Sequence, residues 1–454
     1  MNLRAELLRL VPDERRVSDG DSMLDQHASD LSYHPPHRPD AVVFPESTGE
    51  VAAVVAWANE MRVPIVPFGA GTSLEGHVIP LAGGISLDLT RLNRLIDVRP
   101  ADLDATVHAG VTRSELDAAA GPYGLFFPVD PGADATLGGM AATNASGTTT
   151  VRFGGMRAHV LALEVVLADG RVVHTGSRAV KTSAGYNLTH LFLGSEGTLG
   201  VITELTLRLH PIPEHVVAAR AAFPSVEAAC RGASALIAAG VPVTRCELVD
   251  ATTIGALNAY KRTTFPVQPY LFVELGAGGG GLAGELETAH ELLVDEGATA
   301  FESESDPTAR SRLWDARHNV LHASLALAPG AKAMITDVAV PVSELAAAVE
   351  GARAELDASG LLGGIVAHAG DGNFHVAFLL DPDDAESVAR AARLNVALVD
   401  DALARGGTCT GEHGIGVGKL AYLEREHGDL VPLMRGIKQL LDPNGILNPG
   451  KAVP

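Results

Sequence analysis

The chain has 454 residues, with 34 Lys and Arg against 55 Asp and Glu, and a formal net charge of -21. This balance argues against nucleic-acid binding, which needs clustered basic side chains against phosphate, and against a polybasic membrane anchor. The length predicts two domains, and a hydrophobic content of 46% is enough to fill two cores.

Cysteine usage and the N-terminus indicate a cellular compartment. Cys230, Cys246 and Cys409 are far apart and form no CxxC motif, so disulfides are not expected and a reducing cytoplasm fits. The first residues carry an early acid and no apolar signal core, and no run approaches the ~18 apolar residues of a membrane span. We expect a cytoplasmic protein, with peripheral attachment at a membrane as the alternative.

Short strands and helices alternate over residues 1–213. The sequence Ser47-Thr48-Gly49-Glu50 matches a capping box and opens a helix, which a buried-type strand at 63–68 follows. Thr112–Glu115 is a second capping box, and the hydrophobic runs on either side of Ala168-Asp169-Gly170 predict a hairpin.

Beyond Pro213 the helical patterns become longer and alternate with strands, which predicts an α+β domain whose helices pack on one antiparallel sheet. The tail from about residue 406 returns to Gly-rich loops. The predicted domains are 1–213, 214–405 and a C-terminal segment 406–454. Helices are predicted at 225–239, 283–296, 307–327, 343–359 and 383–405, and strands near 245–250, 270–276, 333–340, 364–369 and 374–380.

Two histidines flank a predicted hairpin turn. Asp371-Gly372 is a turn signal, and folding the segment there brings His368 and His375 toward each other. Glu412, in the glycine-rich stretch 411–416, is a third candidate ligand, and His413 beside it is a titratable base. Two imidazoles and a carboxylate suit Zn, Mn or Fe(II). The alternative is a pair of hydrogen-bonded core histidines, but a Gly-flanked Glu-His pair is expensive to bury without a task.

Three glycine-dense segments form a second pattern. Residues 67–76 follow a strand, and their backbone N–H groups could form a nest for a pyrophosphate, although the spacing excludes a Walker loop and a Rossmann fingerprint. The small, polar run 129–147 is long for a structureless segment and suits close approach to a planar cofactor. The third segment is 194–203. The first segment alone is as typical of a plain glycine-rich turn.

In this order and spacing, the three segments resemble the FAD-binding domain of the vanillyl-alcohol-oxidase/p-cresol-methylhydroxylase superfamily. The two histidine motifs narrow the resemblance to its 2-hydroxyacid branch, and along nearly its whole length the chain is similar to the FAD-dependent D-lactate dehydrogenases. The stretches that carry this most clearly are 127–134, 313–319 and 407–414. The resemblance implies an α+β fold: an FAD-binding domain of two α+β subdomains, a substrate domain with a helix-covered antiparallel sheet, and a C-terminal segment that returns to the active site.

The resemblance also implies the site residues. The first segment would wrap the FAD pyrophosphate, the second would line the ribityl chain and flavin, and the third would pack near the adenine. His368, His375 and Glu412 would hold the metal, and His413 would be the base. The residues implied to bind FAD are Pro67, Phe68, Gly69, Ala70, Gly71, Thr72, Ser73, Leu74, Gly76, Pro131, Gly132, Thr136, Gly138, Gly139, Thr143, Ser146, Gly147, Gly200, Ile202 and Asn448.

Arg317 and Lys332 would meet the substrate carboxylate, with a helix-surface charge and a solvated loop as the respective alternatives. The implied reaction oxidises a D-2-hydroxy acid to a 2-oxo acid. The metal would hold the substrate, His413 would take the hydroxyl proton, and hydride would pass to flavin N5.

Three departures bear on this reading. His77 stands where close D-lactate relatives have Gly, and in superfamily members with covalent flavin a His near the first loop carries the bond; noncovalent FAD remains the prediction. Ala377 and Leu321 stand where D-2-hydroxyglutarate dehydrogenases have Asn and Thr. Both changes remove partners for a second carboxylate, so a monocarboxylate such as D-lactate is favoured.

Several rival functions remain open at this point. They are a glycolate-oxidase-type subunit of a hetero-complex, a D-2-hydroxyglutarate dehydrogenase, a non-enzymatic flavin or metal module, and a metallohydrolase. The module would not need His413, Arg317 or Lys332, and the hydrolase leaves the glycine segments unexplained. The electron acceptor could be a quinone, a cytochrome, another flavoprotein or oxygen, and a homodimer is compatible with the sequence.

Overall fold

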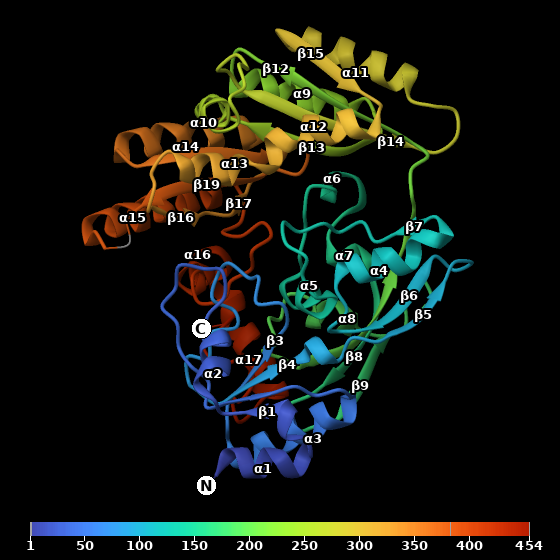
Figure 1. Ribbon diagram of the computed structural model, residues 1–454, viewed down its shortest axis with the longest axis vertical. Coiled ribbons are helices and arrows are strands. Elements are labelled where there is room, and N and C mark those ends of the chain that lie inside the picture. The colour runs from blue at the N-terminus through green and yellow to red at the C-terminus, as the bar shows by residue number, and fades with distance from the viewer. Residues whose placement is uncertain (1, 382, 454) are drawn as a thin grey trace. The chain divides into compact units, whose positions relative to one another are not determined.

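Helices and mostly antiparallel sheets make up the chain, as the predicted α+β class requires (Figure 1). The computed structural model describes residues 2–381 and 383–453. Contacts divide the chain into two units, the first of Met1–Gly147, Gly154–Ile212 and Glu412–Pro454, and the second of Thr148–Phe153 and Pro213–Gly411. Two boundaries differ from the predicted domains by several residues. Residues 148–153, predicted in the first domain, belong to the second unit, and the C-terminal segment rejoins the first unit at Glu412 instead of at residue 406. No helix among the described residues is long and apolar enough to span a membrane.

The first unit is built on two sheets around one core. A four-stranded sheet pairs its last three strands in parallel, and a five-stranded sheet is antiparallel throughout. Their strand orders are β1 (Val17–Ser18), β2 (Ala41–Val43), β4 (Ile85–Asp88), β3 (Ile65–Phe68), and β5 (Leu95–Arg99), β6 (Asp104–His108), β10 (Val201–Arg208), β8 (Val160–Val166), β9 (Val172–Gly176). The hairpin predicted around residue 169 is β8–β9, so that prediction is confirmed.

The helices of the first unit bury apolar faces against these sheets. The strongest example is α3 (Thr48–Met61), which places Val51, Val54, Val55 and Ala58 at the i, i+3, i+4, i+7 spacing of one buried face. The other elements are α1 (Leu3–Leu10), α2 (Asp21–Gln26), α4 (Arg113–Ala120), α5 (Leu137–Thr143), α7 (Met156–His159), α8 (Leu188–Phe192), α16 (Leu420–His427), α17 (Val431–Leu441), β7 (Leu125–Phe126) and β11 (His210–Pro211).

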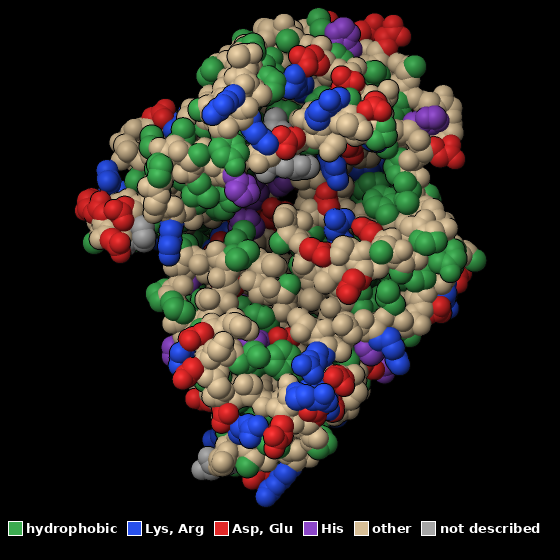
Figure 2. Space-filling view, in the orientation of Figure 1, with side chains coloured by type: hydrophobic (Ala, Val, Ile, Leu, Met, Phe, Trp, Pro, Cys, Tyr) green, Lys and Arg blue, Asp and Glu red, His purple; other side chains and the backbone are tan. Residues whose placement is uncertain are grey.

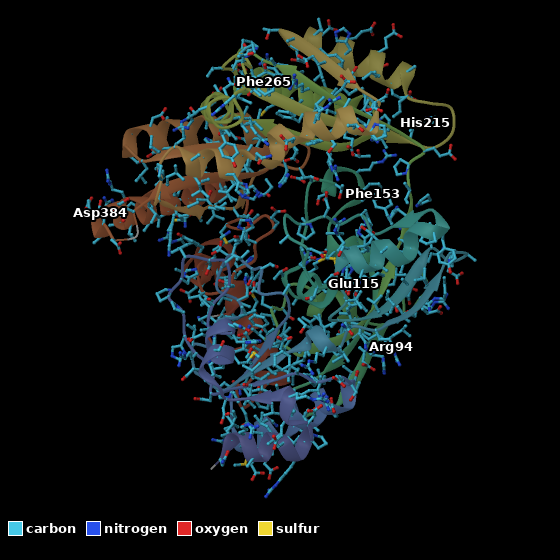
Figure 3. The ribbon with its side chains drawn as sticks, in the orientation of Figure 1. Arg94, Glu115, Phe153, His215, Phe265 and Asp384 are labelled. Carbon is cyan, nitrogen blue, oxygen red and sulfur yellow. The ribbon has the colours of Figure 1, made fainter. Side chains whose placement is uncertain are left out.

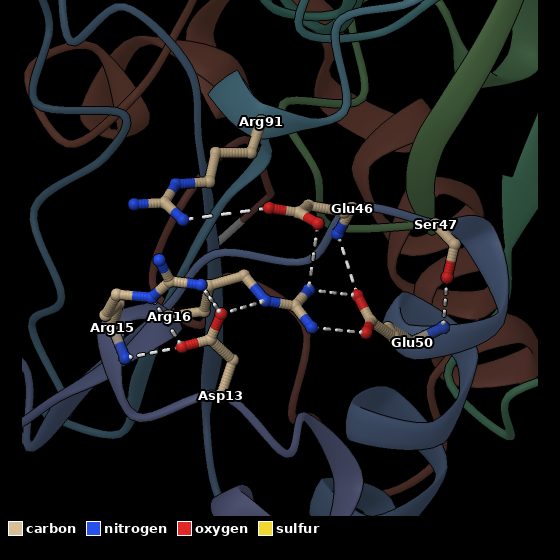
Figure 4. Close-up of polar contacts among 7 residues, drawn as sticks. All are labelled: Asp13, Arg15, Arg16, Glu46, Ser47, Glu50 and Arg91. Carbon is tan, nitrogen blue, oxygen red and sulfur yellow. Dashed lines mark hydrogen bonds and ion pairs between the residues drawn. The ribbon is translucent and has the colours of Figure 1, made fainter.

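Of the two predicted capping boxes, one forms completely. Thr112 accepts a hydrogen bond from Glu115 N while the Glu115 side chain, labelled in Figure 3, accepts from Thr112 N. At α3, Ser47 caps Glu50 N, but the Glu50 carboxylate accepts from Glu46 N and from Arg16 instead of from Ser47 N (Figure 4). Arg16 is a stronger donor than a backbone amide because it is charged and offers two N–H groups.

The second unit is organised by one eight-stranded sheet, as the antiparallel prediction requires. Strands β12 and β15 and helix α10 were not predicted, because β12 is rich in Ala, which favours helix, and β15 is short and exposed. The strand order is β15 (Ala300–Glu304), β12 (His215–Ala222), β14 (Tyr270–Ala277), β13 (Val243–Val249), β18 (Leu362–His368), β19 (Asn373–Leu380) and β16 (Lys332–Ile335), with β17 (Val338–Ala339) also paired to β19.

Helices pack on this sheet around an aromatic core. Phe272 and Trp314 have ring centroids 6.2 Å apart, and Phe265 (Figure 3) packs at the margin of the cluster beneath Arg220. The helix predicted at 307–327 is broken at Asn319, whose side chain donates to Asp315 O. The helices are α6 (Thr150–Phe153), α9 (Val226–Ala238), α10 (Ala251–Lys261), α11 (Ala283–Asp295), α12 (Pro307–His318), α13 (Val320–Ala326), α14 (Leu345–Ser359) and α15 (Ala385–Ala404).

Charge is distributed over the surface without a basic stripe on the face that Figure 2 shows. Lys and Arg side chains are interspersed with Asp and Glu side chains there.

The Arg16–Glu50 pair supplies a test of the first unit's packing. Arg16 Nη1 and Nη2 lie 2.7 and 2.9 Å from the two Glu50 oxygens, and the Arg16 side chain is only 10% exposed. A double-mutant cycle with Arg16→Met and Glu50→Gln, measured by urea unfolding, should give a coupling energy of about 1 kcal/mol or more. The exposed Arg9–Glu6 pair on α1 is the control and should give about 0.3 kcal/mol. Equal couplings would contradict this account.

Candidate active site

The three glycine-dense segments meet within the first unit. Gly69 lies so close to Thr136 that a Cβ on it would be 2.4 Å from Thr136 Oγ1, which joins the first segment to the second. Gly194 N donates to Ala141 O at 3.0 Å, which joins the second segment to the third. Segments far apart in the chain therefore form one continuous backbone surface, and side chains larger than hydrogen at such positions would push it apart.

This surface fits a large planar cofactor. Residues 69–74 and the end of α5 are partly exposed, while Gly138 and Gly147 press against neighbouring backbone, where a Cβ would lie 2.9 Å from Ala109 O and 2.3 Å from Asp130 O. The Oδ1 atom of Asn144 is buried and has no hydrogen-bond partner within the described part of the chain. A buried acceptor is costly unless something donates to it. Asn144 was not assigned from sequence, although Asn at a helix end with positive φ is a recognisable signal.

Asn448 fastens the C-terminal tail to the third segment and to the residue that follows the first. Its side-chain amide donates to His77 O at 3.0 Å and to Glu196 O at 2.7 Å. The buried ammonium of Lys451 donates to Ile79 O and to Asn448 Oδ1. Burial lowers the pKa of Lys451 to about 8, despite the nearby Glu196 and Asp30 carboxylates.

His77 is buried against a carboxylate. Its Nε2 lies 3.3 Å from Glu196 Oε1, and both side chains are almost fully inaccessible. Burial lowers the pKa of His77, but the Glu196 carboxylate outweighs it and raises the pKa above the usual value. The imidazole is therefore held with its Nε2 edge toward the Glu196 carboxylate.

Glu196 also holds the loop that follows His413. Its carboxylate accepts from Ile415 N at 2.7 Å and from Gly416 N at 2.9 Å, while Val417 N donates to Glu75 O at 2.7 Å. Burial raises the pKa of Glu196, but His77 and the two backbone N–H groups lower it by more. The net pKa is therefore below the usual value, and the carboxylate stays ionised. The loop from Glu412 onward is thereby anchored on the first and third glycine segments. Sequence reasoning assigned no role to Glu196.

In the second unit, His368 and His375 face each other across the predicted hairpin. His368 ends β18 and His375 lies in β19, where it pairs with Val366, so both side chains are on the same face. Gly372 forms the turn with a φ of 86°. The ring centroids are 5.4 Å apart and nearly perpendicular, and a ring nitrogen of each lies within 4.8 Å of the other. Both rings are buried.

The hydrogen bonds of the two histidines determine their tautomers. His368 Nδ1 lies 2.7 Å from Glu247 Oε1, and His375 Nδ1 lies 3.0 Å from Thr336 O. Burial raises the pKa of Glu247, but His368 and Arg317 lower it to about 2, so this carboxylate is ionised and can only accept. A backbone carbonyl likewise only accepts. Each Nδ1 is therefore the donor, and Nε2 is the atom of each ring that could ligate a metal, which is how metal-binding histidines are held.

Asp337 fixes the turn side of this hairpin. The buried Asp337 carboxylate accepts from Asn373 Nδ2 and from Thr410 Oγ1, both at 2.7 Å. Gly411 lies directly against Asn373, because a Cβ there would be 2.1 Å from Asn373 Nδ2. The chain therefore passes beside the histidine hairpin at the residue just before Glu412. The carboxylates of Asp337 and Glu247 were both overlooked in the sequence, since each acts through non-local pairing.

Arg317 and Lys332, the two residues predicted to bind the substrate carboxylate, lie in different surroundings. Arg317, on α12, donates through Nη2 and Nε to Glu247 Oε2 at 2.6 and 3.0 Å, so it shares a carboxylate with His368. Lys332 is exposed at the start of β16, opposite Leu380. Leu380 is five residues from His375, which is about 17 Å along a strand. The structure thus brings Arg317 to the histidines but not Lys332. Cys409 is buried, as expected of a packing residue.

Comparison with known proteins agrees with this architecture. Residues 212–452 match the family model described as FAD linked oxidases, C-terminal domain, and residues 39–176 match an FAD binding domain. A protein from Danio rerio named "Probable D-lactate dehydrogenase, mitochondrial" is 46% identical, over 98% of this chain and 90% of the relative. The chain belongs to the FAD-linked oxidase family.

Two further comparisons place this FAD-linked oxidase among its relatives. "D-lactate dehydrogenase [cytochrome], mitochondrial" from Arabidopsis thaliana is 43% identical over 98% of this chain and 79% of the relative. The solved structure of 4-ethylphenol oxidase from Gulosibacter chungangensis aligns with a TM-score of 0.79 at 20% identity, covering 100% of this chain and 96% of that one. The second likeness shows a shared fold and agrees with the resemblance drawn from the glycine segments.

Proposed function

We propose that this FAD-linked oxidase oxidises a D-2-hydroxy acid, D-lactate or a similar monocarboxylate, to the 2-oxo acid, using noncovalent FAD and a divalent metal. The observation that carries the proposal is the histidine pair, since both rings lie buried on one face of the hairpin and each is held through Nδ1 by a group that can only accept. A pair of core histidines would not need this matched arrangement. The names of the two relatives above favour D-lactate as the substrate.

The metal site in this proposal consists of His368, His375 and Glu412. Two nitrogen donors and one carboxylate suit zinc, manganese or Fe(II) and leave positions open for a substrate. Glu412 follows Gly411, which packs on Asn373 at the turn of the hairpin, and this supports its role as the third ligand. When bound, the metal would withdraw electron density from the substrate hydroxyl and lower its pKa.

The remaining side chains position the substrate and handle its proton. Arg317 would bind the substrate carboxylate, for which a planar guanidinium is suited, and Lys332 remains a prediction in that role. His413 would accept the hydroxyl proton as general base. FAD, when bound along the three glycine segments, supplies the acceptor for the hydride from C2. The acceptor that reoxidises the flavin, a quinone, a cytochrome or another flavoprotein, and the predicted cytoplasmic location stay predictions.

Two apolar positions bear on whether the substrate carries a second carboxylate. Ala377, on β19 two residues after His375, and Leu321, on α13, offer no hydrogen-bonding group. A second carboxylate on the substrate would lose its hydration without gaining a partner at these positions. The proposal therefore favours a monocarboxylate over D-2-hydroxyglutarate.

Noncovalent flavin binding is tested by denaturation. The protein should purify yellow, and acid precipitation should release the flavin into the supernatant, because His77, the candidate for a covalent bond, directs its Nε2 toward the Glu196 carboxylate. Absorbance spectra of supernatant and pellet make the measurement. Colour that stays with the pellet would refute noncovalent binding and point to His77.

Metal binding is tested by removing one histidine. His375→Ala should lose the metal and retain FAD, because the histidine hairpin and the glycine segments belong to different units. Elemental analysis and the flavin spectrum of the same sample make the measurement, and His322→Ala, which removes an exposed histidine on α13, is the matched control. Full metal occupancy in His375→Ala would contradict the assignment of this ligand.

The role of His413 is tested by rapid kinetics. His413→Asn should keep fold, FAD and metal but slow flavin reduction by D-lactate by about 10²–10⁴-fold, the usual cost of losing a general base. Stopped-flow measurement should show the loss in the reductive step and not in reoxidation. Reduction at the wild-type rate would remove His413 from the mechanism. Slow reduction together with metal loss would make it a support for Glu412 instead.

A further inference from the structure

Glu247 contacts both a proposed metal ligand and the proposed substrate-binding arginine. It lies on β13 directly opposite His368 on β18, and it is 0% exposed. Its two oxygens are divided between two partners: Oε1 faces His368 Nδ1 at 2.7 Å, and Oε2 faces Arg317 Nη2 and Nε at 2.6 and 3.0 Å. The three residues come from two strands and a helix.

We propose that Glu247 is a positioning residue. Its single carboxylate holds His368 and Arg317 in a fixed mutual orientation, so that the metal on His368 and the substrate carboxylate on Arg317 are held at a fixed separation. This inference rests on the proposed function. It adds a residue that acts on both halves of the substrate, the hydroxyl end through His368 and the carboxylate end through Arg317.

The geometry explains why a carboxylate is needed at this position. Both partners are donors, so the side chain between them must present two acceptors about one carboxylate width apart. Accepting from His368 Nδ1 commits that ring to Nε2 ligation and makes it a better ligand. Accepting from Nε and Nη2 of Arg317 occupies one edge of the guanidinium and leaves the edge with Nη1 for a substrate carboxylate.

Packing alone does not account for Glu247. A buried carboxylate and its ion-pair partners lose hydration, and an apolar side chain of similar size often stabilises a core equally well or better. Structural support alone predicts that replacing Glu247 would lower thermal stability. Positioning predicts in addition that a folded variant would bind metal and substrate less well.

The test variant is Glu247→Gln, which has nearly the same volume but replaces one acceptor oxygen with an NH₂ donor. Whichever way the amide is turned, either His368 or Arg317 then faces a donor. The matched control is Glu274→Gln on β14 of the same sheet, where the Glu274 carboxylate lies 3.6 Å from Arg245 and accepts from Thr244.

The measurements use the full-length FAD holoprotein. Zinc affinity is measured by competition with a chromophoric chelator, and the apparent Kd for D-lactate is measured from stopped-flow flavin reduction. Glu247→Gln should bind zinc about 10–100-fold more weakly than wild type and should show a raised Kd for D-lactate. Glu274→Gln should match wild type in both. Melting temperature and FAD content report on folding separately.

The outcomes separate this inference from the proposed function. One outcome is that wild type binds zinc and His375→Ala does not, while Glu247→Gln keeps both the wild-type zinc affinity and the wild-type Kd for D-lactate. That result would refute the positioning role of Glu247 and leave the proposed metal site standing. If wild type binds no zinc, both fall. Should Glu247→Gln fail to fold, Glu247→Asp decides, because it keeps both acceptors but is one methylene too short to reach both partners. Wild-type values of both constants in folded Glu247→Asp would overturn the proposal.

Discussion

Two groups that can only accept hydrogen bonds, the Glu247 carboxylate and the Thr336 carbonyl, determine what the histidine hairpin can do. Each accepts a hydrogen bond from Nδ1 of one ring, so Nε2 is the atom through which His368 and His375 could bind a metal. The strand register puts both rings on one face, and Asp337 fixes the turn side through Asn373. Without these acceptors, either nitrogen of each ring could carry the proton, and Nε2 would not be reserved as the metal-binding atom.

A comparable constraint governs the first unit, where backbone must approach backbone. Gly138 and Gly147 stand at contacts with the backbone of Ala109 and Asp130 that a larger side chain could not enter without displacing them, and this closeness leaves a surface of peptide groups and small side chains for the cofactor. Glu196 then links the glycine segments to the loop after His413 through two backbone N–H groups. The cofactor surface and the proposed base are therefore parts of one hydrogen-bonded arrangement.

Local signals made much of this predictable. Asp371-Gly372 marked the hairpin, Thr112–Glu115 marked a helix start, and glycine density marked three segments that do meet in space. What escaped prediction depends on pairing between distant residues. Glu247 reaches His368 only because β13 lies beside β18, and Glu50 leaves its capping box because Arg16 is folded against it. Neither the Glu247–His368 contact nor the Glu50–Arg16 contact can be inferred from neighbours in the sequence. The exposed position of Lys332 likewise depends on the pairing of distant strands.

The central claim is that flavin and metal act together on the D-enantiomer of a 2-hydroxy acid. The most direct measurement is anaerobic mixing of the FAD holoprotein with D-lactate or L-lactate, before and after metal removal by a chelator, while flavin absorbance is followed. The account predicts rapid bleaching by D-lactate alone, lost on chelation and restored by added metal with FAD retained throughout. Equal bleaching by L-lactate, or undiminished bleaching of the metal-free protein by D-lactate, would contradict it.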